Sequence, residues 1–238
     1  NYPNTIQLWD VCNVEYENGV LHSDNGDFEV EIDLLIGGSP CQDFSIANSE
    51  RKGLDGVKSG LFYQYLRLKE EVSPAYFLLE NVAMEQSSYN TISRLMGTHP
   101  VDINSERVSA QLRQRSYWTN IGAEDFDLLG NRYCAIPQPP DNGIFLSDIL
   151  EHGFTDKRKH SCLNRWCAKG SERQRYLIKR NSSTGMVTLI YDDPSCDESK
   201  GVRVATQREL ERLQTVPDGY TSILNQRQAC DCLGDGWT

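Results

Sequence analysis

Over the first half of the chain, the hydrophobic and polar positions alternate between the patterns of strands and helices. Short apolar runs at residues 31–36 and 75–82 have the length and composition of buried strands. Between them Leu61, Tyr65 and Leu68 follow helical spacing, which predicts a helix over residues 59–68. The same reasoning predicts strands at residues 5–11, 101–104 and 116–121 and a helix at residues 89–96. Strands that alternate with helices are typical of an α/β sheet.

Two stretches depart from this pattern. Residues 15–27 are polar and contain glycine, which predicts a loop. After residue 122 the chain passes through a proline-rich linker at residues 137–143 and stays polar, basic and irregular to residue 201, with a short strand signal at 186–191. A helix is then predicted at residues 205–214, because Thr206 and Glu209 form a capping box.

Charge and hydropathy narrow the class of protein. The chain has 238 residues and a formal net charge of −10 at pH 7, which argues against a protein that coats nucleic acid without specificity. Lys157-Arg158-Lys159 forms a local basic cluster in this acidic background. No apolar run reaches the ~20 residues needed to cross a bilayer, and the sequence predicts no signal peptide.

The eight cysteines favour reduced thiols in a cytosol-like compartment. His160, Cys162 and Cys167 are close in sequence, and Cys230 and Cys232 form a second pair. These spacings do not make the two paired Cys-x-x-Cys knuckles of a structural zinc site. Ordinary core or surface thiols are therefore the favoured interpretation, and no metal is expected.

The turn after residues 31–36 holds the first candidate for chemistry. Two glycines, a serine and Pro40 end the strand abruptly, which places Cys41 at the edge of an α/β sheet where catalytic groups collect. The alternative for Cys41 is a buried structural thiol. Glu80 follows four apolar residues at the end of the second run, a poorly solvated setting that favours its neutral form.

A third group lies further along the chain, where Arg113 and Arg115 are two residues apart and point to the same face if the segment is extended. Three short motifs thus follow strands in a fixed order: Pro40-Cys41-Gln42, Glu80-Asn81-Val82 and Gln111-x-Arg113-x-Arg115. In this order and context they resemble the motifs of the DNA cytosine-5 methyltransferases. The residues around them are similar to those of the animal de novo enzymes and of related phage or bacterial enzymes.

This resemblance implies an α/β fold, the Rossmann-like sheet of S-adenosylmethionine-dependent methyltransferases, with a small irregular target-recognition insert. It implies a partial catalytic domain at residues 1–122, a target recognition domain at 123–202 and a return to the catalytic domain at 203–238. The family's glycine-rich Phe-x-Gly-x-Gly turn is not found before Asp10. The chain is therefore expected to lack the first strand–helix unit, to be clipped at both ends and to expose a sheet edge or face near Trp9 and Ile36.

The resemblance also implies the site residues. Candidate catalytic residues are Cys41, Glu80, Arg113 and Arg115. Candidate contacts to S-adenosyl-L-methionine are Asp10, Pro40, Leu61, Asp235 and Trp237. Candidate contacts to double-stranded DNA are Gln42, Ser45, Lys157, Arg158 and Lys159. Asp10 is equally consistent with a turn or helix cap and Leu61 with core packing, and Asp235 stands where the family usually has asparagine.

The mechanism implied is a covalent one. The thiolate of Cys41 adds to carbon 6 of a flipped-out cytosine, and carbon 5 then accepts the methyl group. Glu80 supplies a proton or a strong hydrogen bond to ring nitrogen 3, and the arginines hold the oxygen at position 2, Glu80 or a nearby phosphate. Such an enzyme acts in the cytoplasm of a prokaryote or phage host, or in a eukaryotic nucleus.

Three other interpretations stay open. A tRNA cytosine-5 methyltransferase shares the catalytic motifs but is favoured by a Cys-Phe-Thr signature, which this sequence lacks. A catalytically inactive DNA-binding relative usually loses Pro-Cys or Glu-Asn-Val, and both are intact. An unrelated cysteine hydrolase needs a histidine partner, and the four histidines stand in no recognisable catalytic context.

Overall fold

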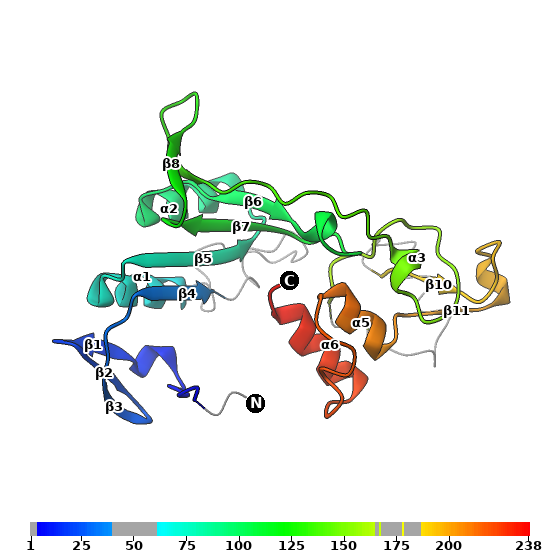
Figure 1. Cartoon of the computed structure of the whole chain (residues 1–238), viewed down its shortest axis with the longest axis horizontal. Coiled ribbons are helices and arrows are strands. Elements are labelled where there is room, and N and C mark those ends of the chain that lie inside the picture. Colours follow the sequence, from blue (N-terminus) through cyan, green and yellow to red (C-terminus); the bar gives the residue numbers. More distant parts are fainter. Residues whose placement is uncertain (1–3, 40–60, 165–166, 168–177, 179–186) are drawn as a thin grey trace. The chain divides into compact units, whose positions relative to one another are not determined.

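The computed structural model describes residues 4–39, 61–164, 167, 178 and 187–238 (Figure 1). Two compact units make up the chain, each assembled from two segments. The first unit comprises Asn1–Ile103 and Gln114–Pro137, and the second comprises residues 104–113 and 138–238.

The first unit holds most of the strands. Its helices are η1 (Val11–Asn13), α1 (Leu61–Val72) and α2 (Gln86–Met96). Its strands are β1 (Glu15–Glu17), β2 (Val20–Ser23), β3 (Gly26–Glu29), β4 (Leu34–Gly38), β5 (Tyr76–Val82), β6 (Val101–Asn104), β7 (Gln114–Thr119), β8 (Ala123–Phe126) and β9 (Arg132–Ala135), of which β6 ends at the unit boundary.

A four-stranded mixed sheet with the order β4-β5-β7-β6 is the frame of the first unit (Figure 1). Strand β4 runs parallel to β5, whereas β7 runs antiparallel to β5. The predicted strands at residues 31–36, 75–82, 101–104 and 116–121 correspond to these four strands. The α/β prediction is therefore confirmed.

One face of this sheet is covered by both helices. Phe77 and Leu79 of β5 and Trp118 of β7 are buried in one cluster with apolar residues of α1 and α2. Alternate residues of a strand point to opposite faces, so the neighbours of these residues along β5 and β7 point to the other face. On that second face Leu34, Ile36 and Tyr76 are 43%, 50% and 53% exposed, and Trp9 of the same unit is 74% exposed.

Gly37 allows α1 to approach β4 closely. A Cβ atom at this position would lie 2.6 Å from Cδ2 and 2.8 Å from Cε2 of the Tyr65 ring, far closer than van der Waals contact. The Tyr65 hydroxyl donates to the carbonyl oxygen of Leu35 (3.3 Å). The ring therefore lies against Gly37 while its hydroxyl is bound to the backbone of the same strand. Glycine at position 37 therefore lets the helix pack on the strand that leads to Pro40.

The N-terminal segment differs from both predictions made for it. Residues 5–10 form no strand, since Trp9 has a φ of 64°, which extended backbone does not adopt. The predicted loop at residues 15–27 is instead the antiparallel meander β1-β2-β3. Leu21 of this meander packs with Val14 and with Leu68 of α1, which explains why a mostly polar stretch forms strands.

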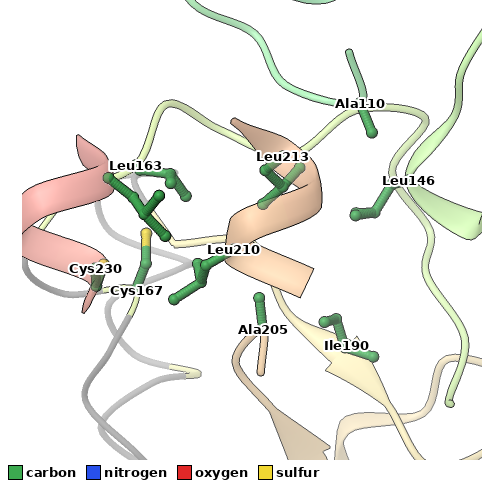
Figure 2. Packing of buried hydrophobic residues seen from close by; sticks show 10 residues of the cluster. Ala110, Leu146, Leu163, Cys167, Ile190, Ala205, Leu210, Leu213 and Cys230 are labelled. Carbon is green, nitrogen blue, oxygen red and sulfur yellow. The ribbon is translucent and has the colours of Figure 1, made fainter. Parts of the chain in front are cut away.

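The second unit is built around helices. It contains η3 (Ser105–Arg107), α3 (Leu146–Ile149), η5 (Glu198–Lys200), α5 (Gln207–Leu213) and α6 (Gln226–Asp235), with the strands β10 (Ile190–Tyr191) and β11 (Val202–Arg203). Leu210 and Leu213 of α5 pack against Leu163, Ile190 and residues of α6 in one buried cluster (Figure 2). Within the described part of the predicted strand at 186–191, only Ile190 and Tyr191 are assigned as strand.

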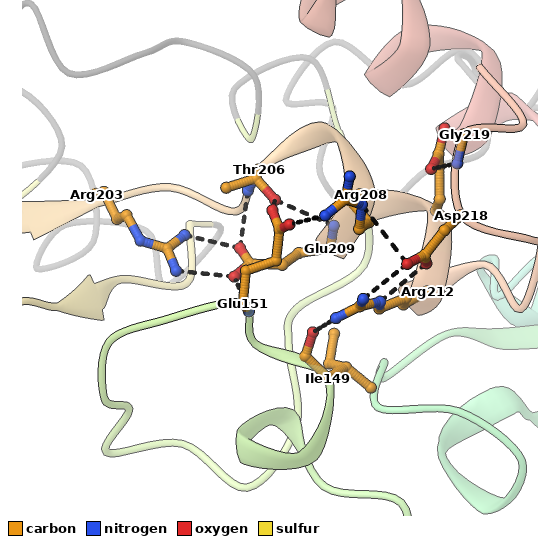
Figure 3. A network of polar contacts seen from close by, with 10 residues as sticks. Ile149, Glu151, Arg203, Thr206, Arg208, Glu209, Arg212, Asp218 and Gly219 are labelled. Atoms are coloured by element: carbon orange, nitrogen blue, oxygen red, sulfur yellow. Dashed lines mark hydrogen bonds and ion pairs between the residues drawn. The ribbon is translucent and has the colours of Figure 1, made fainter. Parts of the chain in front are cut away.

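The predicted capping box at the start of α5 is confirmed. The Thr206 hydroxyl accepts from the Glu209 backbone N–H (3.2 Å), and the Glu209 carboxylate accepts from the Thr206 backbone N–H (2.8 Å). The same carboxylate is fully buried and receives both guanidinium ends of Arg203 at 2.7 and 2.8 Å (Figure 3). Burial alone would raise the pKa of Glu209, but these hydrogen bonds lower it below its usual value.

None of the helices in the described part of the chain combines the length and the apolar composition that a bilayer crossing needs.

Candidate active site

Glu80 and Arg115 form an ion pair on the face of the sheet opposite α1 and α2. Glu80 lies on β5 opposite Tyr117 of β7, and Arg115 lies opposite Val82, one diagonal step away. The Nε atom of Arg115 is 2.8 Å from Oε1 of Glu80, and the two side chains are only 12% and 11% exposed. A charge pair shielded from water in this way is stronger than one at the surface. The structure thus brings two of the predicted catalytic residues together.

The end of β4 lies beside this pair. Gly38 is the register partner of Glu80 in the parallel β4–β5 ladder. The Asn81 side chain donates from Nδ2 to the Ser39 hydroxyl (2.9 Å), and its Oδ1 accepts from the Val82 backbone N–H (2.8 Å). Asn81 is almost fully buried, so this contact fixes the last described residue before Pro40. The predicted site residues Pro40, Cys41, Gln42 and Ser45 lie outside the described residues.

Arg113 has different partners from Arg115. It precedes β7, is 4% exposed and belongs to the second unit. Its guanidinium donates to the carbonyl oxygens of Gly234 (3.0 Å) and Gly236 (2.7 Å) at the end of α6. The two arginines of the motif are therefore engaged with different parts of the chain, and only Arg115 pairs with Glu80 in the described contacts.

The described candidates for cofactor binding carry suitable chemistry. Asp10 is exposed and accepts from the Cys12 backbone N–H (2.9 Å) as the cap of η1, so its cap role is observed. Leu61 is the first residue of α1 and is partly buried. Asp235 and Trp237 are exposed at the end of α6. Exposed carboxylates accept from amino and hydroxyl groups and an indole face stacks on a base, so each of these residues separately carries chemistry that an adenosine group can use.

The basic cluster lines a cavity of about 510 Å³ within the second unit. The residues that line it are Glu106, Arg107, Leu112, Asp141, Phe145, Lys157, Arg158 and Lys159. The Lys157 side chain is 57% exposed, and the Arg158 guanidinium lies 4.7 Å from the centroid of the Phe145 ring. The Lys159 ammonium donates to the carbonyl oxygens of Glu106 (2.5 Å), Ser109 (3.0 Å) and Ile144 (2.6 Å). Three backbone acceptors match the three donors of an ammonium, which favours a structural role for Lys159.

The described cysteines are all free thiols. Within the part of the chain that the structure describes, no group of three or more His, Cys, Asp or Glu residues is placed to hold a metal ion. His160 is buried, and burial lowers the pKa of its imidazole, while Nδ1 lies 2.6 Å from the carbonyl oxygen of Ser161. A neutral imidazole with Nδ1 as donor suits this contact.

Three polar residues of this region were not predicted to act. Asn81 enters the sequence prediction only as part of its motif, although a polar residue at the end of an apolar run is a usable signal. Gln111 opens the arginine motif and is fully buried, with hydrogen bonds to α5 and to Leu163. Gln214, at the end of α5, is its partner. The sequence offered no signal for Gln214, because a glutamine after a helix is ordinarily solvated.

Comparison with known proteins bears directly on the first two of the three motifs. Residues 10–99, which include β4, α1 and β5, match the family model of the C-5 cytosine-specific DNA methylases. Over these residues the chain is similar to that family. The match spans Cys41 and the Glu80-Asn81-Val82 segment, so the resemblance inferred from the motifs is confirmed.

The chain is also similar in sequence to individual methyltransferases of phages and bacteria. The orphan methyltransferase M.Rho11sI of Bacillus phage rho11s is 52% identical over 52 residues, which are 22% of this chain and 10% of that protein. The type II methyltransferase M1.ScrFI of Lactococcus lactis subsp. cremoris is 26% identical over 232 residues, which are 85% of this chain and 58% of that protein. The chain thus spans less than two thirds of the length of these relatives.

Solved methylase structures share the fold. The methyltransferase EhMeth of Entamoeba histolytica superposes with a TM-score of 0.53 at 13% identity, over 86% of this chain and 72% of that one. The Dnmt2 methyltransferase of S. pombe superposes with a TM-score of 0.50 at 16% identity, over 86% of this chain and 74% of that one. At these identities the likeness concerns the fold alone, and it agrees with the α/β sheet described above.

Proposed function

We propose that this methylase segment belongs to an enzyme that transfers a methyl group from S-adenosylmethionine to carbon 5 of cytosine in double-stranded DNA. The observation that carries the proposal is the shielded Glu80–Arg115 pair beside the end of β4. A carboxyl group held by a guanidinium, next to the strand that leads to a cysteine, suits covalent attack on a base.

Cys41 is the proposed nucleophile. It stands two residues beyond Ser39 in the sequence, and a chain of that length reaches at most about 7 Å. Asn81, the neighbour of Glu80, binds Ser39, so this reach includes the space next to Glu80. The thiolate would add to carbon 6 of the cytosine, which gives carbon 5 the character of an enamine.

Glu80 and Arg115 serve the base during this addition. Glu80 would first take up a proton from solvent while one of its oxygens keeps the contact with Arg115, and would then give that proton or a strong hydrogen bond to ring nitrogen 3 as carbon 6 is attacked. Arg115 fixes Glu80 through the 2.8 Å ion pair and offers its remaining donors to the oxygen at position 2. After methyl transfer a water-mediated base removes the proton from carbon 5, the double bond between carbons 5 and 6 reforms, and the Cys41 sulfur leaves as a thiolate. A target cytosine must leave the duplex to reach these groups.

Asp10, Pro40, Leu61, Asp235 and Trp237 are the residues proposed to hold the cofactor. Asp10 and Asp235 would accept from amino and hydroxyl groups of the adenosine, and Trp237 would stack on its base. When bound, the cofactor supplies an activated methyl group on its sulfonium.

The direct test is bisulfite sequencing of DNA from cells that express the full-length gene. Cytosines methylated at carbon 5 resist conversion, so resistant positions should appear within one recurring sequence context. The matched control is the same gene with Glu80→Gln, whose product should leave those positions convertible. Complete conversion in both samples would reject the proposed function.

The basic cluster gives a prediction about DNA affinity. Lys157→Glu and Arg158→Glu should each weaken DNA binding and reduce the slope of log affinity against log salt by ~1 unit, because each would lose one phosphate contact. The control is Lys200→Glu, an equal charge change at an exposed lysine of the same unit that pairs with Asp193. Slopes equal to that of the control would contradict the assignment of Lys157 and Arg158. Lys159 is left unchanged, since its ammonium is bound to three carbonyls.

A further inference from the structure

The Gln-x-Arg-x-Arg motif is divided between two tasks. Arg115 at its end pairs with Glu80, whereas Gln111 and Arg113 are buried in the second unit and bind elements near the end of the chain. Buried side chains of this polarity are retained only where their hydrogen bonds are satisfied, so their partners indicate what they do.

Gln111 is connected to the segment Leu233–Thr238 through the side chain of Gln214. Its Nε2 donates to Oε1 of Gln214 (3.0 Å) and to the carbonyl oxygen of Leu213 (3.4 Å). The same Oε1 of Gln214 accepts from the Thr238 hydroxyl (2.6 Å), and Nε2 of Gln214 donates to the carbonyl oxygen of Leu233. One buried pair of glutamines therefore ties both ends of the segment Leu233–Thr238 to α5.

Arg113 holds the middle of the same segment. The last carbonyl groups of a helix lack partners within the helix and need donors from elsewhere. Two nitrogens of the Arg113 guanidinium supply them at Gly234 (3.0 Å) and Gly236 (2.7 Å), the residues on either side of Asp235. A planar fork with two parallel donors fixes both carbonyls at once, and an ammonium group cannot reproduce that geometry.

We infer that Gln111, Arg113 and Gln214 are positioning residues that hold the turn Gly234–Thr238, and with it Asp235 and Trp237, in the geometry for binding the adenosine part of the cofactor. The inference rests on the proposed function and deepens it. Arg113 thereby leaves the group that acts on the base, and Arg115 remains in it.

The test compares two substitutions of the same kind in the full-length gene product. Arg113→Lys should raise the KM for S-adenosylmethionine about tenfold with little change in kcat, since one charge-assisted hydrogen bond to the turn is lost. Arg115→Lys should do the reverse, lowering kcat with little change in that KM. A fall in kcat at saturating cofactor in Arg113→Lys, with unchanged KM, would overturn the inference.

A second readout needs no cofactor. Amide hydrogen exchange of residues 234–238 should be about tenfold faster in Arg113→Lys, while the amides of β5 and β7 keep their wild-type rates. Equal exchange in variant and wild type would also overturn the inference.

Thr238→Val removes only the hydroxyl donor to Gln214. It should raise the KM for S-adenosylmethionine and the exchange rate of residues 234–238 as Arg113→Lys does, but by smaller factors. This variant keeps the inference testable if Arg113→Lys fails to fold. A wild-type protein without methyl transfer rejects the proposed function, whereas an active wild type with unmoved readouts in the variants rejects only the role of this network.

Discussion

Cys41→Ser is expected to abolish the denaturation-resistant adduct that the full-length protein should form with DNA containing 5-fluorocytosine. Fluorine at carbon 5 blocks the removal of a proton there, so the bond between the sulfur and carbon 6 is trapped once the methyl group has been transferred. A serine hydroxyl is far less ionised than a thiol at neutral pH and is a weaker nucleophile. The measurement is gel electrophoresis under denaturing conditions with labelled DNA and cofactor.

The control for this experiment is Cys12→Ser. Cys12 is an exposed thiol, and its hydrogen bond to Asp10 raises its pKa, which lowers the fraction present as the nucleophilic thiolate. The Cys12→Ser protein should form the adduct as the wild type does. An adduct that persists in Cys41→Ser would mean that another residue attacks the base.

Glu80→Gln is expected to lower turnover by ~10²-fold or more while DNA affinity changes little. The amide keeps an oxygen that can accept from Arg115 at the position of the present 2.8 Å contact, so the pair should stay in place. What the amide cannot do is transfer a proton to the ring. Single-turnover methylation and DNA binding, measured on the same preparations, separate the two effects.

The matched control is Glu124→Gln. Glu124 also pairs with an arginine, Arg132, but its side chain is 56% exposed on the β8–β9 hairpin. The same chemical change there should leave turnover close to the wild-type value. Parallel losses of turnover and DNA affinity in Glu80→Gln would instead indicate that Glu80 serves the structure of the site.

The sheet and the Glu80–Arg115 pair follow from the sequence, because both rest on signals of short range. Apolar runs identify β4 and β5, the alternation at residues 101–104 identifies β6, and a polar residue at the end of an apolar run must find a partner. The meander β1-β2-β3 did not follow, although one signal was present. Asn18 and Gly19 have φ values of 53° and 83°, those of a type I′ hairpin turn, and Asn-Gly is the dipeptide that favours it.

The partners of Arg113 could not be predicted in the same way. Arg113 and Arg115 are two residues apart, and this spacing predicted that their side chains point to the same face of a strand. The prediction requires that both residues belong to one strand. Strand β7 begins at Gln114, so the backbone rule does not extend to Arg113. Its actual partners are more than 100 residues away in sequence, at Gly234 and Gly236, and contacts of that range depend on how the whole second unit packs.

The close approach of Tyr65 to Gly37 limits which substitutions this strand can accept during evolution. Leu34 and Ile36 are half exposed, so many residues can replace them at little cost in folding. Position 37, one step further along the same strand, tolerates no side chain unless the Tyr65 ring or α1 itself moves. That helix also carries Arg67, which donates to the carbonyl oxygens of Val11 and Val14, so a shift would reach the N-terminal segment. Divergent relatives that keep this helix against this strand should therefore vary on both sides of a glycine that does not change.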